Sequence, residues 1–308
     1  MQQAVHAHCQ LGGGERLHEI IVGAETEAPH HVRLVPKRGE EDDREVVGGG
    51  IGPERQRLLA LASPLLPEIR RGLRSRSAEV RARTVNTLGV LSLPADTAEI
   101  RAALDDPSPL VAMVAARALA RSGGAAHAEA MVAHLHRFQE WRPSYLAAML
   151  AAVGPAIVPA LLETLRDRSG PLRVRAVAAD ALVRLNAPEG GALAAALLGR
   201  ERDPELRAAL LRLIAHVGQA DQLAAVRAEL DAPEEGVRIA AVRALAALGG
   251  DEDIPRLARA VEDPSRWVAE QAARGLAAGA GRETLRTLRR TTAAVRAIAD
   301  EVLQDDAP

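Results

Sequence analysis

Aromatic residues are almost absent from this chain: its 308 residues include one Phe, one Tyr and two Trp, which is 1%. Apolar residues still make up 48% of the sequence, so a buried core has to be built from Ala, Leu and Val. Alanine has the highest helix propensity, whereas strands are rich in aromatic and β-branched residues. The composition therefore argues against an all-β fold and favours closely packed helices.

Cysteine and long apolar runs are also scarce. Cys9 is the only cysteine, which rules out an internal disulfide. No segment approaches the ~20 consecutive apolar residues of a membrane-spanning helix. The first residues have neither the basic start nor the apolar core of a secretory signal. We therefore expect a cytoplasmic protein, with peripheral membrane association as an open alternative.

A dense basic patch is missing too. The formal net charge is −2, and basic and acidic residues alternate along the chain. Proteins that bind nucleic acid concentrate Arg and Lys on one face to neutralise phosphates. The sequence thus argues against a nucleic-acid partner.

What the chain does contain is an internal repeat, clearest in residues 235–249. In that copy Val237 is followed by an apolar residue at +4 and a large one at +8. The same pattern starts at anchors separated by 27 to 34 residues: Val80, Val111, Tyr145, Val174, Leu206, Val237, Val268 and Val295. A period of 20–50 residues is typical of solenoids.

Each repeat predicts a pair of helices. Offsets 0, +3, +4, +7 and +8 fall on one side of a helix, and in the Val237 copy all five residues are apolar. A second amphipathic run, such as residues 221–230, lies between successive copies. We call the two helices A and B. Stacked A–B hairpins share a continuous core that one hairpin cannot bury alone. We therefore predict an all-α solenoid of about eight hairpins over residues 53–308, ending in a capping pair.

Residues 1–52 lie outside the repeat. They contain five basic and nine acidic residues, hence a net charge of −4, and show no helical periodicity. This composition predicts a flexible arm. An alternative is that the segment is not a natural part of the protein.

The motif Asp-Pro-x-x-x-Val-Arg-x-x-Ala-x-x-Ala-Leu matches in parts throughout residues 65–303. With this motif the chain resembles HEAT repeats, in particular the short bacterial type named after the phycobilisome lyase subunits. The resemblance implies a right-handed superhelix with the B helices lining its concave side. Since such repeats serve many scaffolds, we predict a non-catalytic scaffold or adaptor that binds a protein partner along the groove.

Two columns of arginine accompany the repeat. The column at offset +1 from the anchors predicts a structural ladder to acids in the turns, such as Asp203 or Asp231. The column at +6 is better placed to face the groove, where it could bind an acidic peptide or phosphate; a merely solvated face is the alternative. The +1 column is Arg81, Arg175, Arg207, Arg238 and Arg296, and the +6 column is Arg117, Arg212, Arg243 and Arg274.

The few aromatic residues are the remaining binding candidates. Phe138, Trp141 and Tyr145 lie within eight residues, in the repeat with the longest spacing, and Trp267 directly precedes the Val268 anchor. Buried aromatic side chains often anchor interfaces. The alternative is that they only fill space in an irregular hairpin or between hairpins.

Motifs for chemistry were not found. There is no phosphate-binding loop, nucleophile elbow or pair of catalytic carboxylates, and His134 and His136 are poorly spaced for a metal. The His-Glu pairs through which the HEAT-like deoxyhypusine hydroxylases bind iron are represented only by His18-Glu19. We therefore expect no enzyme activity, cofactor, metal or small-molecule substrate. The alternative is a lyase-type or accessory protein acting on a prosthetic group, as in phycobilin lyases.

Overall fold

The computed structural model describes residues 53–305, and all regular elements in this range are helical. The predicted arm at 1–52 lies outside the described residues. The chain divides into two compact units, Met1–Ser122 and Gly123–Pro308, hereafter the first and the second unit.

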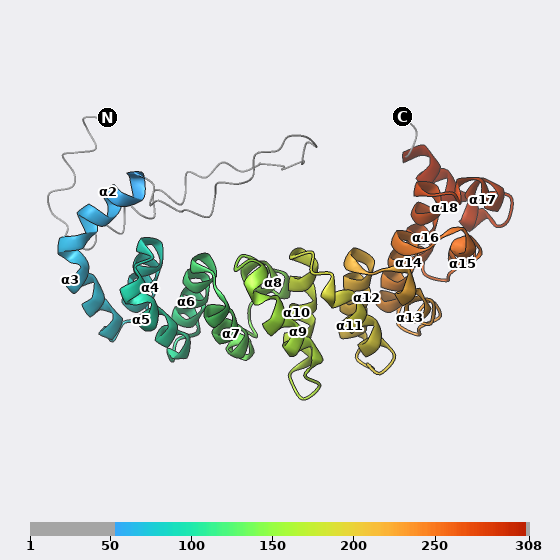
Figure 1. The fold of residues 1–308 in the computed structure, drawn as a ribbon. Coiled ribbons are helices and arrows are strands. Elements are labelled where there is room, and N and C mark those ends of the chain that lie inside the picture. Colours follow the sequence, from blue (N-terminus) through green and yellow to red (C-terminus); the bar gives the residue numbers. More distant parts are fainter. Residues whose placement is uncertain (1–52, 306–308) are drawn as a thin grey trace, which may run out of the picture. The chain divides into compact units, whose positions relative to one another are not determined.

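The first unit contains two hairpins preceded by a helix. Its helices are α2 (Pro53–Ala62), α3 (Leu66–Arg71), α4 (Ala78–Leu91), α5 (Thr97–Ala102) and α6 (Pro109–Ser122) (Figure 1). Short 3-10 turns, Gly72–Arg74 and Ala103–Asp105, extend the A helices α3 and α5. The B helix α4 begins after its N-cap Ser77, whose side chain accepts a hydrogen bond from the backbone N–H of Val80.

The second unit contains six hairpins. The helices alternate between A and B in chain order: α7 (Ala125–Ala133), α8 (Pro143–Ala151), α9 (Val158–Arg166), α10 (Leu172–Arg184), α11 (Glu189–Leu198), α12 (Pro204–Val217), α13 (Leu223–Arg227), α14 (Glu235–Leu248), α15 (Ile254–Ala260), α16 (Arg266–Ala278), α17 (Arg282–Leu288) and α18 (Ala293–Asp305). Within this unit each B helix packs against the next B helix and against its own A helix. The predicted all-α solenoid of stacked hairpins is confirmed, whereas the handedness of its superhelix stays a prediction.

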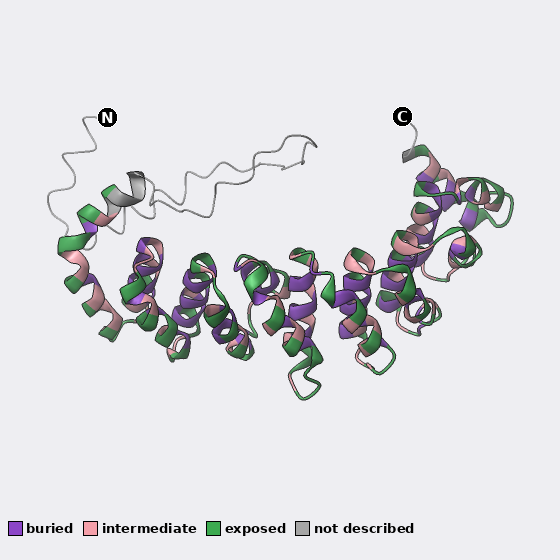
Figure 2. Ribbon diagram, viewed as in Figure 1, coloured by how far each residue is buried: buried purple, intermediate pink, exposed green. Residues whose placement is uncertain are grey.

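The core lies along the helix faces that the repeat pattern predicts. In α14 the anchor Val237 and the residues at +4 and +8, Ala241 and Leu245, are fully buried. Figure 2 shows such buried positions recurring from one helix to the next within each unit. Small residues let the B helices approach closely: a Cβ added to Gly275 of α16 would lie 2.6 Å from Cβ of Ala246 in α14.

One hairpin departs from the regular form. After α7 the chain makes a 3-10 turn at Leu135–Arg137, and α8 does not begin until Pro143. Phe138 in this connection is fully buried. The extra residues of the third repeat therefore form an irregular A–B connection that packs around the ring of Phe138.

Within residues 53–305 no single helix is long and apolar enough to cross a membrane. Two neighbouring segments, Pro143–Ala151 and Pro155–Arg166, are together long and apolar enough, but the chain bends by 109° between them.

Candidate binding surfaces

Four of the five arginines at offset +1 pair with acids as the predicted ladder requires: Arg81, Arg175, Arg207 and Arg238. Arg175 Nη1 lies 2.9 Å from Glu201 Oε2, and Arg238 Nε lies 2.9 Å from Asp263 Oδ2. Arg207 reaches Glu234 at 3.0 Å and also contacts Glu229. In the first unit Arg81 pairs with Asp106 at 2.7 Å. In each case the acid belongs to the following hairpin, so we call each pair a rung.

Three of the four rung arginines also bind their own hairpin. Arg81 Nη1 donates to the carbonyl of Ser75 at 2.9 Å, and Arg238 Nη1 donates to the carbonyls of Ala232 and Pro233 at 2.9 and 3.0 Å. Arg175 donates to the carbonyl of Leu165 near the end of α9. These arginines therefore link their own hairpin to the A–B turn of the next.

The rungs perturb the acidity of their members. The hydrogen bond to Asp263 raises the pKa of Arg238 above its ordinary value. Burial alone would raise the pKa of the Glu201 carboxyl. Hydrogen bonds from the N–H groups of Arg202 and Asp203 and from Arg175 outweigh that effect, so the pKa of Glu201 is lowered. Both groups are thereby held in their charged forms.

The acids predicted for the ladder were partly wrong. Asp203 instead caps α12, where its carboxylate accepts from the N–H of Leu206 at 2.9 Å. Asp231 pairs with Arg259 of α15 at 3.1 Å. Arg296 donates to the carbonyl of Arg289 at 3.1 Å. The arginine column could be predicted because its arginines have a fixed offset from the anchors. The acidic partners could not, because the turns vary in length and place different acids opposite each arginine.

Sequence reasoning missed a second set of ion pairs on the A helices. Arg227 donates to both oxygens of the fully buried Asp253, at 2.8 and 2.6 Å. In the first unit Arg70 donates to the fully buried Asp96 at 2.6 Å. The available signal was the common separation of 26 residues between arginine and aspartate.

The arginines at offset +6 are exposed, but they have polar neighbours. Arg212 of α12 pairs with Asp180 of α10 at 2.9 Å, and Arg243 of α14 donates to Gln271 of α16 at 2.8 Å. Arg274 pairs with Glu270 on its own helix at 2.6 Å. Arg117 is exposed on α6 in the first unit. The three arginines of the second unit therefore lie on consecutive B helices.

The aromatic candidates separate by burial. Phe138 is fully buried and packs inside the hairpin, so its ring is not presented to a partner. Trp141 is half-buried and stacks on the exposed Tyr145, with ring centroids 5.5 Å apart. Trp267, at the start of α16, is 65% exposed. The sequence treats the first three as one cluster, but only Trp141 and Tyr145 form a ring pair at the surface.

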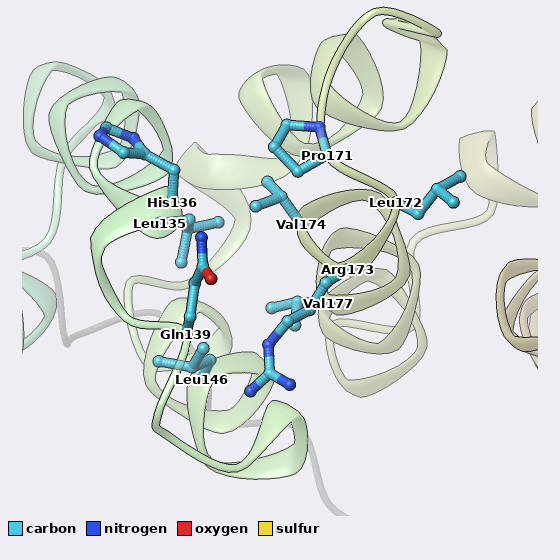
Figure 3. A pocket seen from close by; sticks show the side chains of 9 residues that line it. All are labelled: Leu135, His136, Gln139, Leu146, Pro171, Leu172, Arg173, Val174 and Val177. Atoms are coloured by element: carbon cyan, nitrogen blue, oxygen red, sulfur yellow. The ribbon is translucent and has the colours of Figure 1, made fainter.

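A cavity of about 250 Å³ lies beside this aromatic pair, between the irregular A–B connection and the start of α10. Figure 3 shows the side chains of Leu135, Gln139, Leu146 and Val177 gathered around it, with Leu172 pointing away. Arg173 at its rim donates a hydrogen bond to the backbone carbonyl of Trp141. Within residues 53–305 no three His, Cys, Asp or Glu side chains come together in a way that could hold a metal ion.

Comparison with known proteins identifies part of the chain. Residues 191–277 match the family model described as HEAT repeats. A comparison with curated protein sequences found no match.

Two solved structures are similar to this chain. One is human deoxyhypusine hydroxylase in complex with glycerol, with 20% identity, a TM-score of 0.33, and coverage of 80% of this chain and 96% of the other. The second is the complex of CpcE and CpcF of phycocyanin lyase from Nostoc sp.. It has 20% identity, a TM-score of 0.36, and coverage of 88% and 94%.

These two structures correct the prediction that the protein is not an enzyme. That prediction rested on missing motifs, yet both similar structures are those of enzymes. The missing motifs therefore give no ground for excluding catalysis, and a non-catalytic role is not part of our proposal.

Proposed function

Because the chain is a HEAT-repeat protein, we propose that it binds another protein along the exposed side of the B helices in its second unit. HEAT repeats commonly mediate protein interaction, which supports a protein as the partner. We place this function in the cytoplasm, and cell fractionation tests the location.

The observation that carries this proposal is the row of arginines at offset +6. Arg212, Arg243 and Arg274 recur at intervals of 31 residues and are exposed on the consecutive, mutually packed helices α12, α14 and α16. A guanidinium has five N–H donors, and each of these three spends only one or two of them on the neighbours named above. The remaining donors suit carboxylates of an acidic partner segment.

The test is capture of partners from the native host, identified by mass spectrometry. Replacing Arg212, Arg243 and Arg274 together with Gln should reduce capture of the wild-type partner about tenfold. The matched control replaces Arg200, Arg259 and Arg286, exposed arginines outside this row, which removes the same charge. The control should retain capture, and both variants should melt like the wild type. Equal capture by the two triple variants would refute the arginine row as the binding surface.

The second candidate function is that of a lyase-type or accessory protein acting on a prosthetic group. The similarity to the CpcE and CpcF complex of phycocyanin lyase prompts this candidate. Protein purified from its native host should then carry a visible absorption band or a metal in about one-to-one ratio. Colourless, metal-free protein that still captures its partner would count against this candidate and leave the first intact.

A further inference from the structure

Two junctions between hairpins of the second unit lack the arginine of the ladder. At offset +1 from the anchor, α8 carries Leu146 and α16 carries Ala269, and both side chains are buried. The junctions that follow α10, α12 and α14 all have arginine there. At these two junctions the anchor position +1 therefore supplies no guanidinium to the space between one A–B turn and the next.

A cavity occurs at each of the two junctions. The cavity after α8 has a volume of about 250 Å³ and lies between the A–B connection at Leu135–Gln139 and the start of α10. The cavity after α16 has a volume of about 500 Å³ and lies between the turn at Val261–Pro264 and the start of α18. Both lie at a junction without a rung, whereas a third cavity, of about 360 Å³, lies beside Asp263 at a junction that has one. We call the first of them the α8 cavity.

The α8 cavity also carries a reversed rung. In the hairpins of α14 and α4 the carbonyl four residues before the anchor, that of Pro233 or Arg76, accepts from the arginine at +1. The corresponding carbonyl here is that of Trp141, and it accepts from Arg173 of the following hairpin. This contact brings a guanidinium from the opposite side to the rim of the cavity, where Figure 3 shows it directed toward Leu146 and Gln139.

The lining of the α8 cavity defines what would fit. Its floor is apolar and consists of Leu135, Leu146 and Val177, which are nearly fully buried. Its polar lining consists of His136, Gln139 and Arg173, without a carboxylate. The cavity after α16, by contrast, is lined by Glu262 and Asp263 as well as Arg266. Only the α8 cavity combines an apolar floor with a purely neutral or cationic rim.

The volume of the α8 cavity indicates which kind of ligand it can hold, a side chain or a large cofactor. Sites for drug-sized molecules and cofactors typically have volumes of ~300–1,000 Å³, whereas a cavity of ~150 Å³ already admits benzene. At about 250 Å³ the α8 cavity therefore suits one or two apolar side chains. A carboxylate next to them would lie opposite Arg173, where a charge-assisted hydrogen bond is stronger than a neutral one.

We propose that the α8 cavity takes an apolar side chain from a partner protein segment, and that Arg173 binds a carboxylate of the adjacent residue in that segment. This inference rests on the proposed function, because it assumes that the partner is a protein. It adds a site apart from the arginine row and names the chemistry of the segment: a large apolar residue next to Asp or Glu.

The experiment measures binding of short synthetic peptides to the full chain by fluorescence anisotropy. The peptides share a central Leu and differ in its neighbours, which are Glu, Gln or Lys. The wild type should bind the Glu-flanked peptide about tenfold more tightly than the Gln-flanked one. Arg173→Gln should abolish that preference and leave the weaker binding of the Gln-flanked peptide unchanged. Arg266→Gln, the same change at the rim of the other cavity, should keep the preference.

A second variant tests the cavity itself. Val174→Phe adds bulk at a half-buried lining position and should weaken all three peptides equally, provided that its melting curve matches the wild type. No binding to the wild type, no preference for Glu, or the same loss in Arg266→Gln would overturn the proposal. If a peptide of residues 15–26 of this chain, which contains Glu19-Ile20, outcompetes all others, the occupant is the chain's own segment and a partner is excluded.

The outcome is separable from that of the arginine row. The triple variant of Arg212, Arg243 and Arg274 should bind the peptides like the wild type. If it captures its partner normally while the peptide preference persists, the arginine row fails and the α8 cavity stands. If the triple variant loses the partner and the wild type shows no preference for the Glu-flanked peptide, the arginine row stands and the α8 cavity fails.

Discussion

From α9 to α16 the hairpins are joined by an apolar face and by arginine rungs, whereas the hairpin of α7 and α8 has no rung to its successor. The regular hairpins share a buried apolar face and also arginine rungs, as at Arg175 and Arg238. The irregular hairpin has Leu146 at its rung position, and beside the apolar face it shares only the exposed contact of Arg173 with the carbonyl of Trp141. It also adds the buried ring of Phe138. A junction of this repeat can thus dispense with a rung, and a cavity lies at this one.

The apolar face should dominate stability in the regular hairpins. Leu182 of α10 is fully buried, so Leu182→Asp would bury an unpaired carboxylate and lower the free energy of unfolding by more than ~4 kcal/mol. Loss of helical circular dichroism at lower denaturant concentration measures this effect. Arg184→Asp, at an exposed position of the same helix, is the control and should change little. A wild-type unfolding curve for Leu182→Asp would contradict the repeat register.

Breaking one rung should have the next largest effect. Arg175 and Glu201 are 3% and 11% exposed, so Arg175→Met leaves a buried carboxylate without its cation and should destabilise by about 3 kcal/mol. Adding Glu201→Gln should recover most of that loss. For the exposed pair of Arg266 and Glu301, Arg266→Met should change stability by less than ~0.5 kcal/mol. Equal losses at the two pairs would show that the rung has no special role.

The rungs should also make the stability of the regular hairpins depend on acid. The pKa of Glu201 in the folded protein is lowered from its ordinary 4.5. Its contribution is therefore fully present above pH 4.5 and is lost as the pH falls through the lowered value. Melting temperatures measured from pH 7 downward test this. The double variant Arg175→Met with Glu201→Gln should lose part of the decline below pH 4.5; an unchanged decline would assign it to other carboxylates.

The smallest effect belongs to the surface of the irregular hairpin. Trp141→Leu removes its stacking on Tyr145 and should lower the free energy of unfolding by about 1 kcal/mol. Tyr145→Leu removes the same ring pair, so the double variant should lose less than the sum of the two single changes. Strict additivity in this double-mutant cycle would show that the stack contributes nothing.

The sequence predicted the parts of this fold that depend on periodicity. The offsets of Val237, Ala241 and Leu245 predict that these residues lie in the core, because helical spacing is a local property. Likewise, the +1 arginines were assigned to the ladder because they repeat at one offset.

Features that depend on the geometry of the turns were not predictable. The acids opposite Arg175 and Arg207 differ from those expected because each turn has its own length. The contact of Arg173 with the carbonyl of Trp141 joins residues 32 positions apart, and no repeat offset predicts it. The α8 cavity could not be predicted either. Its walls come from two hairpins, and nothing in the sequence distinguishes Leu146, which stands at the rung position, from other core leucines.

Leu146 and Ala269 also have a mechanical consequence. A rung acts as a clasp between the turn ends of neighbouring hairpins, so those ends should resist local opening after α10, α12 and α14. After α8 and α16 no clasp of this kind exists, and the polar contacts that cross these junctions, Arg173 with the carbonyl of Trp141 and Arg266 with Glu301, are exposed. Amide hydrogen exchange should therefore divide the second unit at these two seams, into segments that open as separate cooperative blocks.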